Sequence, residues 1–245
     1  MKLLAIDTSG LVASAALLSD GELQAEYTTN FKKTHSQTLL PMIAQLQEML
    51  QLDLTSLDAI ALAEGPGSFT GLRIGAATAK GLGLALEKPL IGVPTVDALA
   101  YNLTGCTGLI CPLMNARRNQ TYTGIYRFSG TQMITERAQC CIPLGEILTD
   151  LNTRGETVMF LGDGVPEFRP QIEEGCTVPF AFAPPHLSRQ RAGAVAALAA
   201  IAYACGNVVS ADDFAPVYLR LSQAERERLE KEAAQAAADA ARMTP

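Results

Sequence analysis

The chain has 245 residues, of which 48% are hydrophobic and 18% are charged, and its formal net charge is -6 at pH 7. This length accommodates one large domain or two small lobes with a sizeable core. The negative charge provides no overall field to attract nucleic acid, which argues against a dominant tRNA-binding surface on this chain alone. The six cysteines form no Cys-x-x-Cys pair, and this favours free thiols in a reducing compartment.

Neither an export signal nor a membrane anchor is evident in the sequence. Asp7 interrupts the N-terminal apolar run too early for a signal peptide. The longest apolar segment, residues 192–205, is shorter than the roughly 20 residues that a membrane-spanning helix needs. We therefore expect a cytoplasmic protein that does not contact a membrane.

The first half of the chain predicts a three-strand meander followed by helix–strand units. The dipeptide Asp20-Gly21 is a typical hairpin turn between the second and third strands. Short apolar runs indicate strands, and apolar residues at helical spacing indicate helices. The predicted elements are strands at residues 2–9, 11–19, 22–29, 59–63 and 89–93, and helices at residues 34–52 and 72–86.

A glycine-rich turn joins the fourth strand to the second helix. Gly65 and Gly67 permit backbone angles that other residues avoid, and Ser68 or Thr70 can cap the first helical turn. A strand, a glycine-rich turn and a helix together direct unpaired N–H groups at a small anion. The alternative is a tight, well-capped turn without a ligand. No Gly-Lys-Ser/Thr follows, so the turn is not a Walker loop.

The two helices of the first half predict an association surface. Small residues recur every fourth position on the second helix, and interior glycines cost about 1 kcal/mol each against alanine, so close approach of another backbone is expected to compensate. The alternative is that both helices cover the sheet of their own lobe. The expected interface residues are Leu39, Met42, Ile43 and Leu46 of the first helix and Gly71, Gly75, Ala79 and Gly83 of the second.

From residue 108 onward the pattern starts again, with strands at residues 109–115, 121–128 and 132–140, further strands at 158–161 and 178–183, and a helix at 193–205. A meander followed by helix–strand units, occurring twice, is the duplicated layout of the actin, Hsp70 and sugar-kinase (ASKHA) superfamily. We therefore predict an α/β protein with two actin-like lobes. The predicted divisions are residues 1–105, residues 106–221, and a charged, alanine-rich helical tail at residues 222–245.

Four stretches resemble one protein family. The most specific is Gly-Pro-Gly-Ser-Phe-Thr-Gly-Leu-Arg-Ile-Gly at residues 65–75; the others lie at residues 4–9, 115–122 and 215–220. Together they resemble the TsaB (YeaZ) family. The resemblance implies a non-catalytic scaffold subunit for threonylcarbamoyladenosine (t6A) modification of tRNA, paired with the catalytic paralogue TsaD and the ATPase TsaE. It further implies a homodimer when the chain is alone, and contact with tRNA only through the complex.

The resemblance also suggests where a nucleotide would bind. In the actin-like superfamily an aspartate at the end of the first strand helps to hold a nucleotide's metal and phosphates, and Asp7, Thr8 and Ser9 occupy the matching place. The alternative is that Asp7 only caps the hairpin. The candidate nucleotide- or phosphate-binding residues are Asp7, Thr8, Ser9, Gly65, Gly67, Ser68 and Thr70.

Other residues argue against independent chemistry. Asn115 ends the equivalent strand of the second repeat, where family relatives often carry aspartate, and an amide cannot ionise. The catalytic paralogue binds its metal through His-x-x-x-His, but Leu39 stands four residues after His35. We expect no catalytic residue, no metal, and no cofactor required by this chain beyond weak binding of ATP or ADP. The alternatives are an ATP-dependent small-molecule kinase and, less favoured, a metalloprotease.

Overall fold

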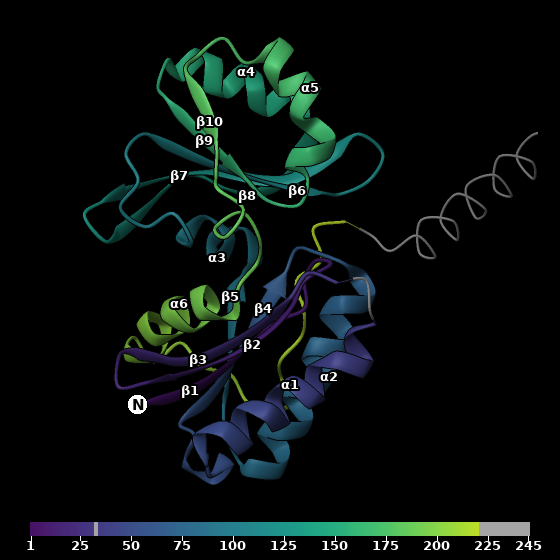
Figure 1. Cartoon of the computed structure of the whole chain (residues 1–245), viewed down its shortest axis with the longest axis vertical. Coiled ribbons are helices and arrows are strands. Elements are labelled where there is room, and N and C mark those ends of the chain that lie inside the picture. The colour runs from purple at the N-terminus through teal and green to yellow at the C-terminus, as the bar shows by residue number, and fades with distance from the viewer. Residues whose placement is uncertain (32–33, 221–245) are drawn as a thin grey trace, which may run out of the picture.

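A computed structural model describes residues 1–31 and 34–220. The predicted tail at residues 222–245 lies outside the described residues. Two five-stranded sheets form two lobes, stacked one above the other in Figure 1. Among the described residues, no helix is long and apolar enough to cross a lipid bilayer.

The first sheet has the order β3-β2-β1-β4-β5. Its central strand β1 pairs antiparallel with β2 and parallel with β4, so a meander is joined to a parallel unit. β1 and β4 are buried along nearly their whole length, as expected for strands covered on both faces. The strands are β1 (Lys2–Asp7), β2 (Ala13–Ser19), β3 (Glu22–Thr29), β4 (Ala59–Gly65) and β5 (Leu90–Pro94).

The second sheet repeats this arrangement with the order β10-β9-β6-β7-β8. Its central strand β6 pairs antiparallel with β7 and parallel with β9, as β1 does with β2 and β4. The predicted duplicated α/β fold is confirmed. The strands are β6 (Leu109–Asn115), β7 (Gln120–Ser129), β8 (Gln132–Pro143), β9 (Val158–Leu161) and β10 (Phe180–Phe182).

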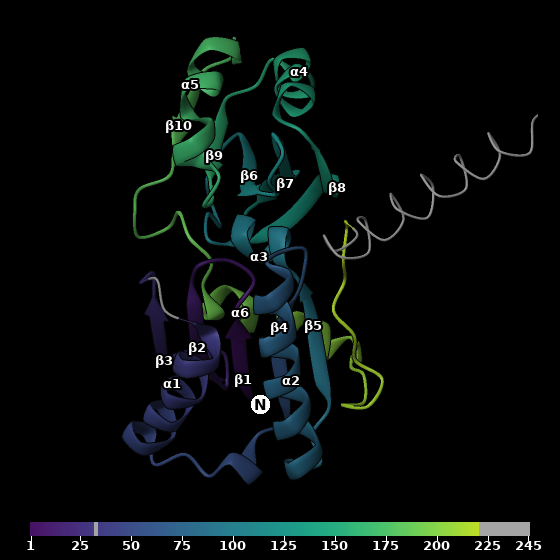
Figure 2. The same ribbon diagram turned by 90° about the vertical axis from the view of Figure 1, so that its right-hand side faces the viewer.

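Helices cover both faces of the first sheet. α1 (His35–Leu50) and α2 (Phe69–Leu86) lie on one face. Along the chain, a short 3₁₀ helix, η1 (Leu54–Ser56), connects α1 to β4. α6 (Ala192–Ala204) lies on the other face (Figures 1 and 2). Two separate apolar clusters result, one on each side of the sheet. The sequence predicted all three of these α-helices.

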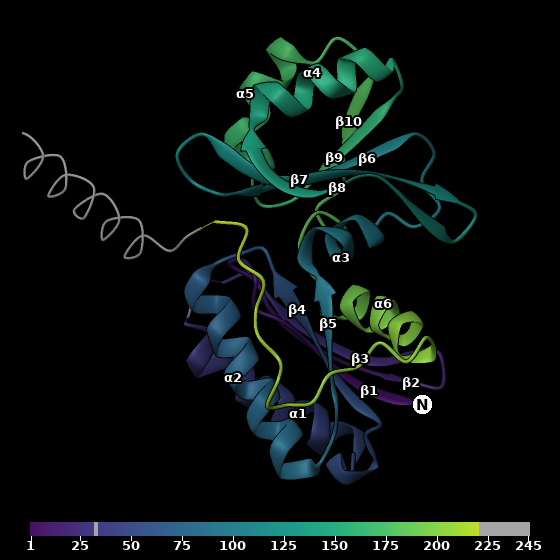
Figure 3. The same ribbon diagram turned by 180° about the vertical axis from the view of Figure 1, so that it is seen from behind.

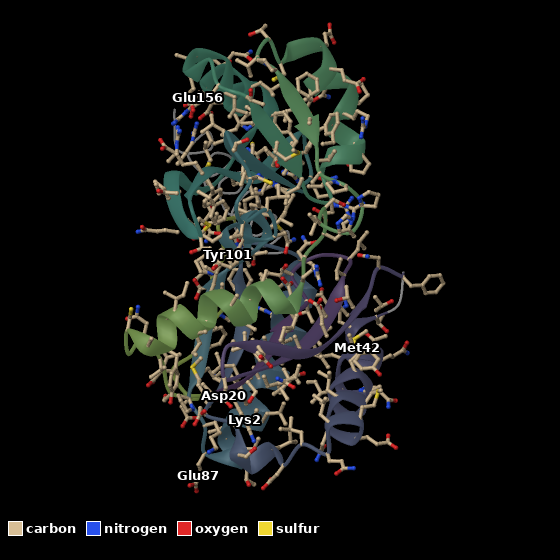
Figure 4. The ribbon with its side chains drawn as sticks, turned by 60° about the vertical axis from the view of Figure 1, so that its left-hand side comes forward. Lys2, Asp20, Met42, Glu87, Tyr101 and Glu156 are labelled. Atoms are coloured by element: carbon tan, nitrogen blue, oxygen red, sulfur yellow. The ribbon has the colours of Figure 1, made fainter. Side chains whose placement is uncertain are left out.

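Three further helices were not predicted. α4 (Leu144–Arg154) and α5 (Val165–Gly175) cover the second sheet on one side, and α3 (Thr95–Tyr101) lies between the lobes, where Figure 4 labels Tyr101. α5 contains two prolines, which hide its helical pattern. α4 could have been recognised, because its buried residues recur at helical spacing: Leu144, Ile147, Leu148 and Leu151.

The end of the described chain returns to the first lobe. α6 packs on β1 and β2, Val209 pairs with Leu90, and the Val217 N–H donates to the Glu64 carbonyl. In Figure 3 this last, yellow-green segment runs beside α2 toward the second lobe. The structure therefore differs from the prediction that all of residues 106–221 form the second lobe, because α6 completes the core of the first one.

The small residues of α2 face their own lobe. An added Cβ at Gly71 would overlap the Thr8 carbonyl oxygen, and one at Gly75 would overlap the Thr8 hydroxyl. Ala79 is fully buried, and a Cβ at Gly83 would lie 3.0 Å from the Leu90 side chain. The predicted interface role of these four residues is wrong, since the compensating backbone approach is internal.

The predicted interface residues of α1 are buried in the same way. Leu39, Ile43 and Leu46 are at most 4% exposed and belong to the core beneath α1, and Met42 packs against that core from its edge. Their assignment to a partner surface is therefore wrong for the three buried residues. Any partner of these helices must contact other positions.

Candidate functional site

A cleft of about 730 Å³ separates the two lobes. The first lobe contributes the turn after β1 and the start of α2, and the second contributes the end of β6 and the start of α5. Segments from both repeats therefore meet there, as expected when strand ends converge at one edge of a sheet. The described lining residues include Ser9, Gly10, Gly67, Ser68, Thr70, Asn115, Arg117, Asp163, Glu167, Tyr218 and Arg220.

Asp7 lies beneath the cleft and is only 1% exposed. Its Oδ1 accepts hydrogen bonds from the Ser9 N–H at 2.8 Å and the Ser9 hydroxyl at 2.6 Å. Burial raises the pKa of Asp7 from 3.8 to about 6, although the Ser9 hydrogen bonds and His35 oppose the shift. Asp7 therefore caps its turn, and it does so at an electrostatic cost.

Asp163, which follows β9, is the acidic residue that the sequence prediction missed. Burial raises its pKa, while Arg189 acts in the opposite direction. The charge of Asp163 in turn raises the pKa of Asp7. Only its place directly after a predicted strand, in Gly162-Asp163-Gly164, could have indicated it from sequence.

Several buried polar atoms near these acids lack a hydrogen-bond partner. Among the described residues they are Asp7 Oδ2, His35 Nδ1, Asp163 Oδ1 and both side-chain polar atoms of Gln190. His35 Nε2 bonds to the Gly10 carbonyl, and Gln190 packs directly against Gly10. The unpaired atoms thus surround the turn after β1. Two of these five atoms are carboxylate oxygens, from Asp7 and Asp163.

The glycine-rich turn is used by the protein itself. The Ser68 N–H donates to the Ser9 carbonyl at 2.7 Å, and Ser68 Oγ caps α2 by accepting from the Gly71 N–H at 3.3 Å. An added Cβ at Gly67 would overlap the Ser9 carbonyl oxygen, and one at Gly65 would overlap that of Val217. These contacts favour the ligand-free alternative, a tight and well-capped turn.

The seven candidate phosphate-binding residues divide into two groups. Ser9, Gly67, Ser68 and Thr70 line the cleft. Asp7, Thr8 and Gly65 do not, since Thr8 donates to the Gly71 carbonyl at 2.8 Å and Gly65 donates to Thr95 Oγ1 at 3.1 Å.

On the opposite wall Asn115 ends β6. Its side-chain amide donates to Glu167 of α5, and its Oδ1 accepts from the Arg117 N–H at 2.7 Å. An amide at this place is physically sensible, because a carboxylate here would face Glu167 and lie close to Asp163. The second lobe therefore keeps the turn but carries no acid at the end of its central strand.

A magnesium-bound nucleotide, which the actin-like fold implies, fits these residues poorly. Asp7 and Asp163 have free carboxylate oxygens that suit a cation. The phosphate side is deficient, because the Ser68 N–H is occupied and Gly67 lies against Ser9. Across the described chain, no group of three or more His, Cys, Asp or Glu side chains is arranged to hold a metal ion.

The last described residues cross the mouth of the cleft. The Tyr218 ring packs on Phe69 of α2 with centroids 4.9 Å apart, and its hydroxyl accepts from Arg73 Nε at 3.3 Å. The Arg220 guanidinium donates to the carbonyls of Ala116 and Arg117 in the second lobe. Residues 217–220 therefore tie α2 to the β6–β7 turn.

The sequence matches the family model for TsaD, described as tRNA N6-adenosine threonylcarbamoyltransferase, over residues 22–228. It is 36% identical over 174 residues to the tRNA threonylcarbamoyladenosine biosynthesis protein TsaB of Bacillus subtilis, covering 71% of this chain and 76% of that protein. It is 37% identical to TsaB of Escherichia coli over 130 residues, which cover 52% of this chain but only 55% of the relative.

The fold matches solved structures along nearly their whole length. YeaZ from Pseudomonas aeruginosa superimposes with a TM-score of 0.77 at 29% identity, covering 89% of this chain and 99% of that one. A second structure, described as an uncharacterized protein with similarity to peptidase YEAZ from Pseudomonas aeruginosa, gives a TM-score of 0.74 at 27% identity, with the same coverage of both chains. Sequence and fold thus agree that the chain belongs to the TsaB (YeaZ) family.

Proposed function

We propose that this chain is a non-catalytic subunit of the t6A machinery, which pairs with a catalytic paralogue of its own fold and supports threonylcarbamoyl transfer to an adenosine of tRNA. Two relatives carry the name of t6A biosynthesis proteins, and the matching family model is that of the transferase. A duplicated fold that matches the model of the catalytic family, but that lacks its metal-binding histidine pair, suits a supporting subunit.

The cleft supports a non-catalytic role. Asn115 cannot act as a base, and Asp7 is only 1% exposed and does not line the cleft. A small-molecule kinase would need charge directed at a transferring phosphoryl group, whereas the Ser68 N–H of the glycine-rich turn already donates to the Ser9 carbonyl. These features disfavour the kinase alternative, and Leu39 in place of a second histidine after His35 disfavours the metalloprotease.

The pairing surface is assigned to the outer faces of α1 and α2. Leu40 is 55% exposed, and Ala44, Ala77, Gly81 and Ala85 are exposed as well. Ala77, Gly81 and Ala85 recur every fourth residue, so they form a second small-residue stripe opposite the buried one. An exposed apolar face built from two adjacent helices is typical of a helix–helix association surface.

Gly81 is the observation that carries this assignment. It lies inside an 18-residue helix, where glycine costs about 1 kcal/mol against alanine. An added Cβ would meet nothing within 4 Å, unlike those at Gly71 and Gly75 of the same helix. No contact with residues 1–31 or 34–220 explains the glycine, so close approach by another subunit is its natural explanation.

The substitution Gly81→Gln tests the pairing. It introduces bulk at the proposed contact, and it should raise helix stability by up to about 1 kcal/mol because glutamine is the better helix former. We expect pairing with the catalytic paralogue to fall at least tenfold, measured by sedimentation of the purified mixture. Loss of t6A from tRNA in cells that depend on the variant should accompany it.

Gly145→Gln is the matched control, since Gly145 lies in α4 and a Cβ there also meets nothing within 4 Å. This variant should pair normally. If Gly81→Gln pairs as well as wild type while folding normally, the assigned surface is wrong.

Three further properties belong to the same proposal. An ATPase subunit joins the pair, tRNA is contacted only within the assembly, and the outer face of α1 and α2 forms a homodimer when the paralogue is absent. The chain requires no nucleotide of its own and binds ATP or ADP weakly, because the phosphate side of the cleft is deficient. Titration with a fluorescent ADP analogue measures this directly; tight, magnesium-dependent binding would contradict it.

A further inference from the structure

The ten arginines of the described residues divide into two equal groups. Five form ion pairs with carboxylates: Arg127, Arg137, Arg154, Arg169 and Arg191. The other five, Arg73, Arg117, Arg118, Arg189 and Arg220, form none with any described carboxylate. The chain as a whole carries a net charge of -6, so acidic partners are plentiful. Unpaired guanidinium groups on such a protein call for an explanation.

Four of the five arginines without an ion pair to a described carboxylate line the cleft or lie next to residues that line it. Arg117 and Arg220 line the cleft, and Arg118 is the next residue of the same exposed turn. Arg73 stacks on Phe69 at 3.9 Å and donates to Tyr218, both of which line the cleft. Arg189 acts electrostatically on Asp163. Arg73 and Arg220 donate hydrogen bonds to neutral groups, and Arg117 and Arg189 act on Asp163 only at a distance, without an ion pair.

The turn that carries Arg117 and Arg118 has an unfavourable backbone. Arg117, Arg118 and Asn119 have φ angles of 64°, 55° and 57°, a left-handed conformation that costs non-glycine residues about 1 kcal/mol or more each. The Arg220 guanidinium holds the turn from the other lobe through the carbonyls of Ala116 and Arg117. The result is that Arg117 and Arg118 are presented to solvent side by side.

Charge separates the mouth of the cleft from its floor. The floor carries Asp7 and Asp163 with unpaired carboxylate oxygens, and these repel a phosphate group that enters deeply. The mouth carries guanidinium groups from both lobes, and arginine suits phosphate because its planar fork makes two parallel hydrogen bonds. This arrangement favours an extended polyanion lying across the mouth over a nucleotide inserted into the floor.

We propose that Arg117 and Arg118, together with Arg73 and Arg220, bind the phosphate backbone of RNA across the cleft mouth. The inference rests on the proposed function, which brings this chain to tRNA within an assembly. The contact is electrostatic and independent of base sequence. It is local, which reconciles it with the negative net charge of the whole chain.

The test is a fluorescence-anisotropy titration of the full-length chain, assembled with its catalytic paralogue, against an unmodified, labelled tRNA transcript at several salt concentrations. The double variant Arg117→Ala/Arg118→Ala should weaken RNA binding about tenfold or more. It should also make the slope of log affinity against log salt shallower by about two, since each lost phosphate contact removes about one counterion.

The control variant Lys88→Ala/Arg169→Ala also removes two positive charges, but at positions away from the proposed RNA contact. Lys88 follows Glu87, which Figure 4 places at the end of the first lobe remote from the cleft, and Arg169 lies on α5. This control should bind RNA like wild type. Equal losses in the two variants, or a wild type without salt-dependent RNA binding, would overturn the proposal.

A parallel titration with a labelled ADP distinguishes the two sources of phosphate. If the Arg117→Ala/Arg118→Ala variant loses ADP affinity but keeps RNA affinity, the arginines serve a nucleotide and the proposal fails. Pairing of each variant with the paralogue is followed separately by co-elution. A failure to pair therefore counts against the proposed function, whereas normal pairing with unchanged RNA affinity and salt slope counts against the role of the arginines.

Discussion

The ends of the two central strands show how the lobes diverged while keeping one local geometry. Asp7 ends β1 and accepts from the N–H of Ser9, two residues on; Asn115 ends β6 and accepts from the N–H of Arg117, also two residues on. Both are the turn that Asp and Asn side chains form with their own backbone. The conformational role is shared and the charge is not.

The surroundings explain the difference in charge. Asp7 lies almost fully buried against Ser9, with His35 as the favourable charge. Asn115 is half-buried, and its amide donates to Glu167, which an aspartate could not do. An acid in the first lobe and an amide in the second are therefore each fitted to their neighbours. The comparison teaches that one turn geometry accommodates either an acid or an amide.

The largest expected effect concerns the helices that follow the parallel strands, α2 and α5. Gly75→Leu would force a side chain into Thr8, whose hydroxyl is buried and bonded to Gly71, so we expect it to cost more than about 3 kcal/mol or to prevent folding. Gly175→Leu in α5 meets only the flexible Leu148 side chain, at 3.2 Å, and should cost far less. Urea unfolding compares the two; similar losses would show that close packing is not confined to the first lobe.

The second prediction concerns the stability that the protein loses by burying the Asp7 carboxylate in the first lobe. Asp7→Asn keeps the acceptor for Ser9 but removes the buried charge. A pKa raised from 3.8 to about 6 corresponds to a loss of about 3 kcal/mol at neutral pH. The variant should therefore be more stable than wild type by about that amount at pH 7, measured by urea unfolding.

A third prediction concerns how the free energy of unfolding of wild type and Asp7→Asn changes with pH. Because the folded state holds the Asp7 proton more tightly, wild-type stability should fall as the pH rises from about 4 to about 6. Asp7→Asn should lack this fall, so the difference between the two proteins should close toward pH 4. Parallel pH profiles would mean that Asp7 is not the group responsible.

The smallest expected effect is in the second lobe. Asn115→Asp removes the hydrogen bond to Glu167 and places two carboxylates together, which should cost about 1 kcal/mol because Glu167 is exposed. Adding Glu167→Gln supplies a donor and should restore most of the stability. A single variant that is as stable as wild type, or a double variant without recovery, would show that charge does not determine the residue at this position.

The sequence predicted the order of the elements well, because strands and amphipathic helices leave local patterns. All ten strands and the helices α1, α2 and α6 lie within a few residues of their predicted places. The repeated meander identified the duplicated fold, which the two sheet orders confirm. Helices with weak or interrupted patterns were missed, above all α5 with its two prolines.

The sequence did not predict which neighbour the small-residue face of α2 packs against. Gly71, Gly75, Ala79 and Gly83 form a stripe that requires a close neighbour, and spacing alone cannot say whether that neighbour belongs to the same chain. In the structure the neighbours of this stripe include Thr8 and Leu90, whereas Gly81 on the outer face has no described neighbour within 4 Å of an added Cβ. A periodic pattern thus indicates that a helix face is packed, while the tertiary structure determines which residues it packs against.

The family followed from the sequence alone, since the run at residues 65–75 is specific and local. The site did not. Asp163 and Gln190 reach the turn after β1 from far along the chain, and the strap at residues 217–220 crosses to the other lobe. Their meeting depends on how two sheets stack and where α6 returns. Sequence patterns encode neighbours a few residues apart, whereas burial, unpaired charge and the contacts between lobes are long-range properties that only the tertiary structure decides.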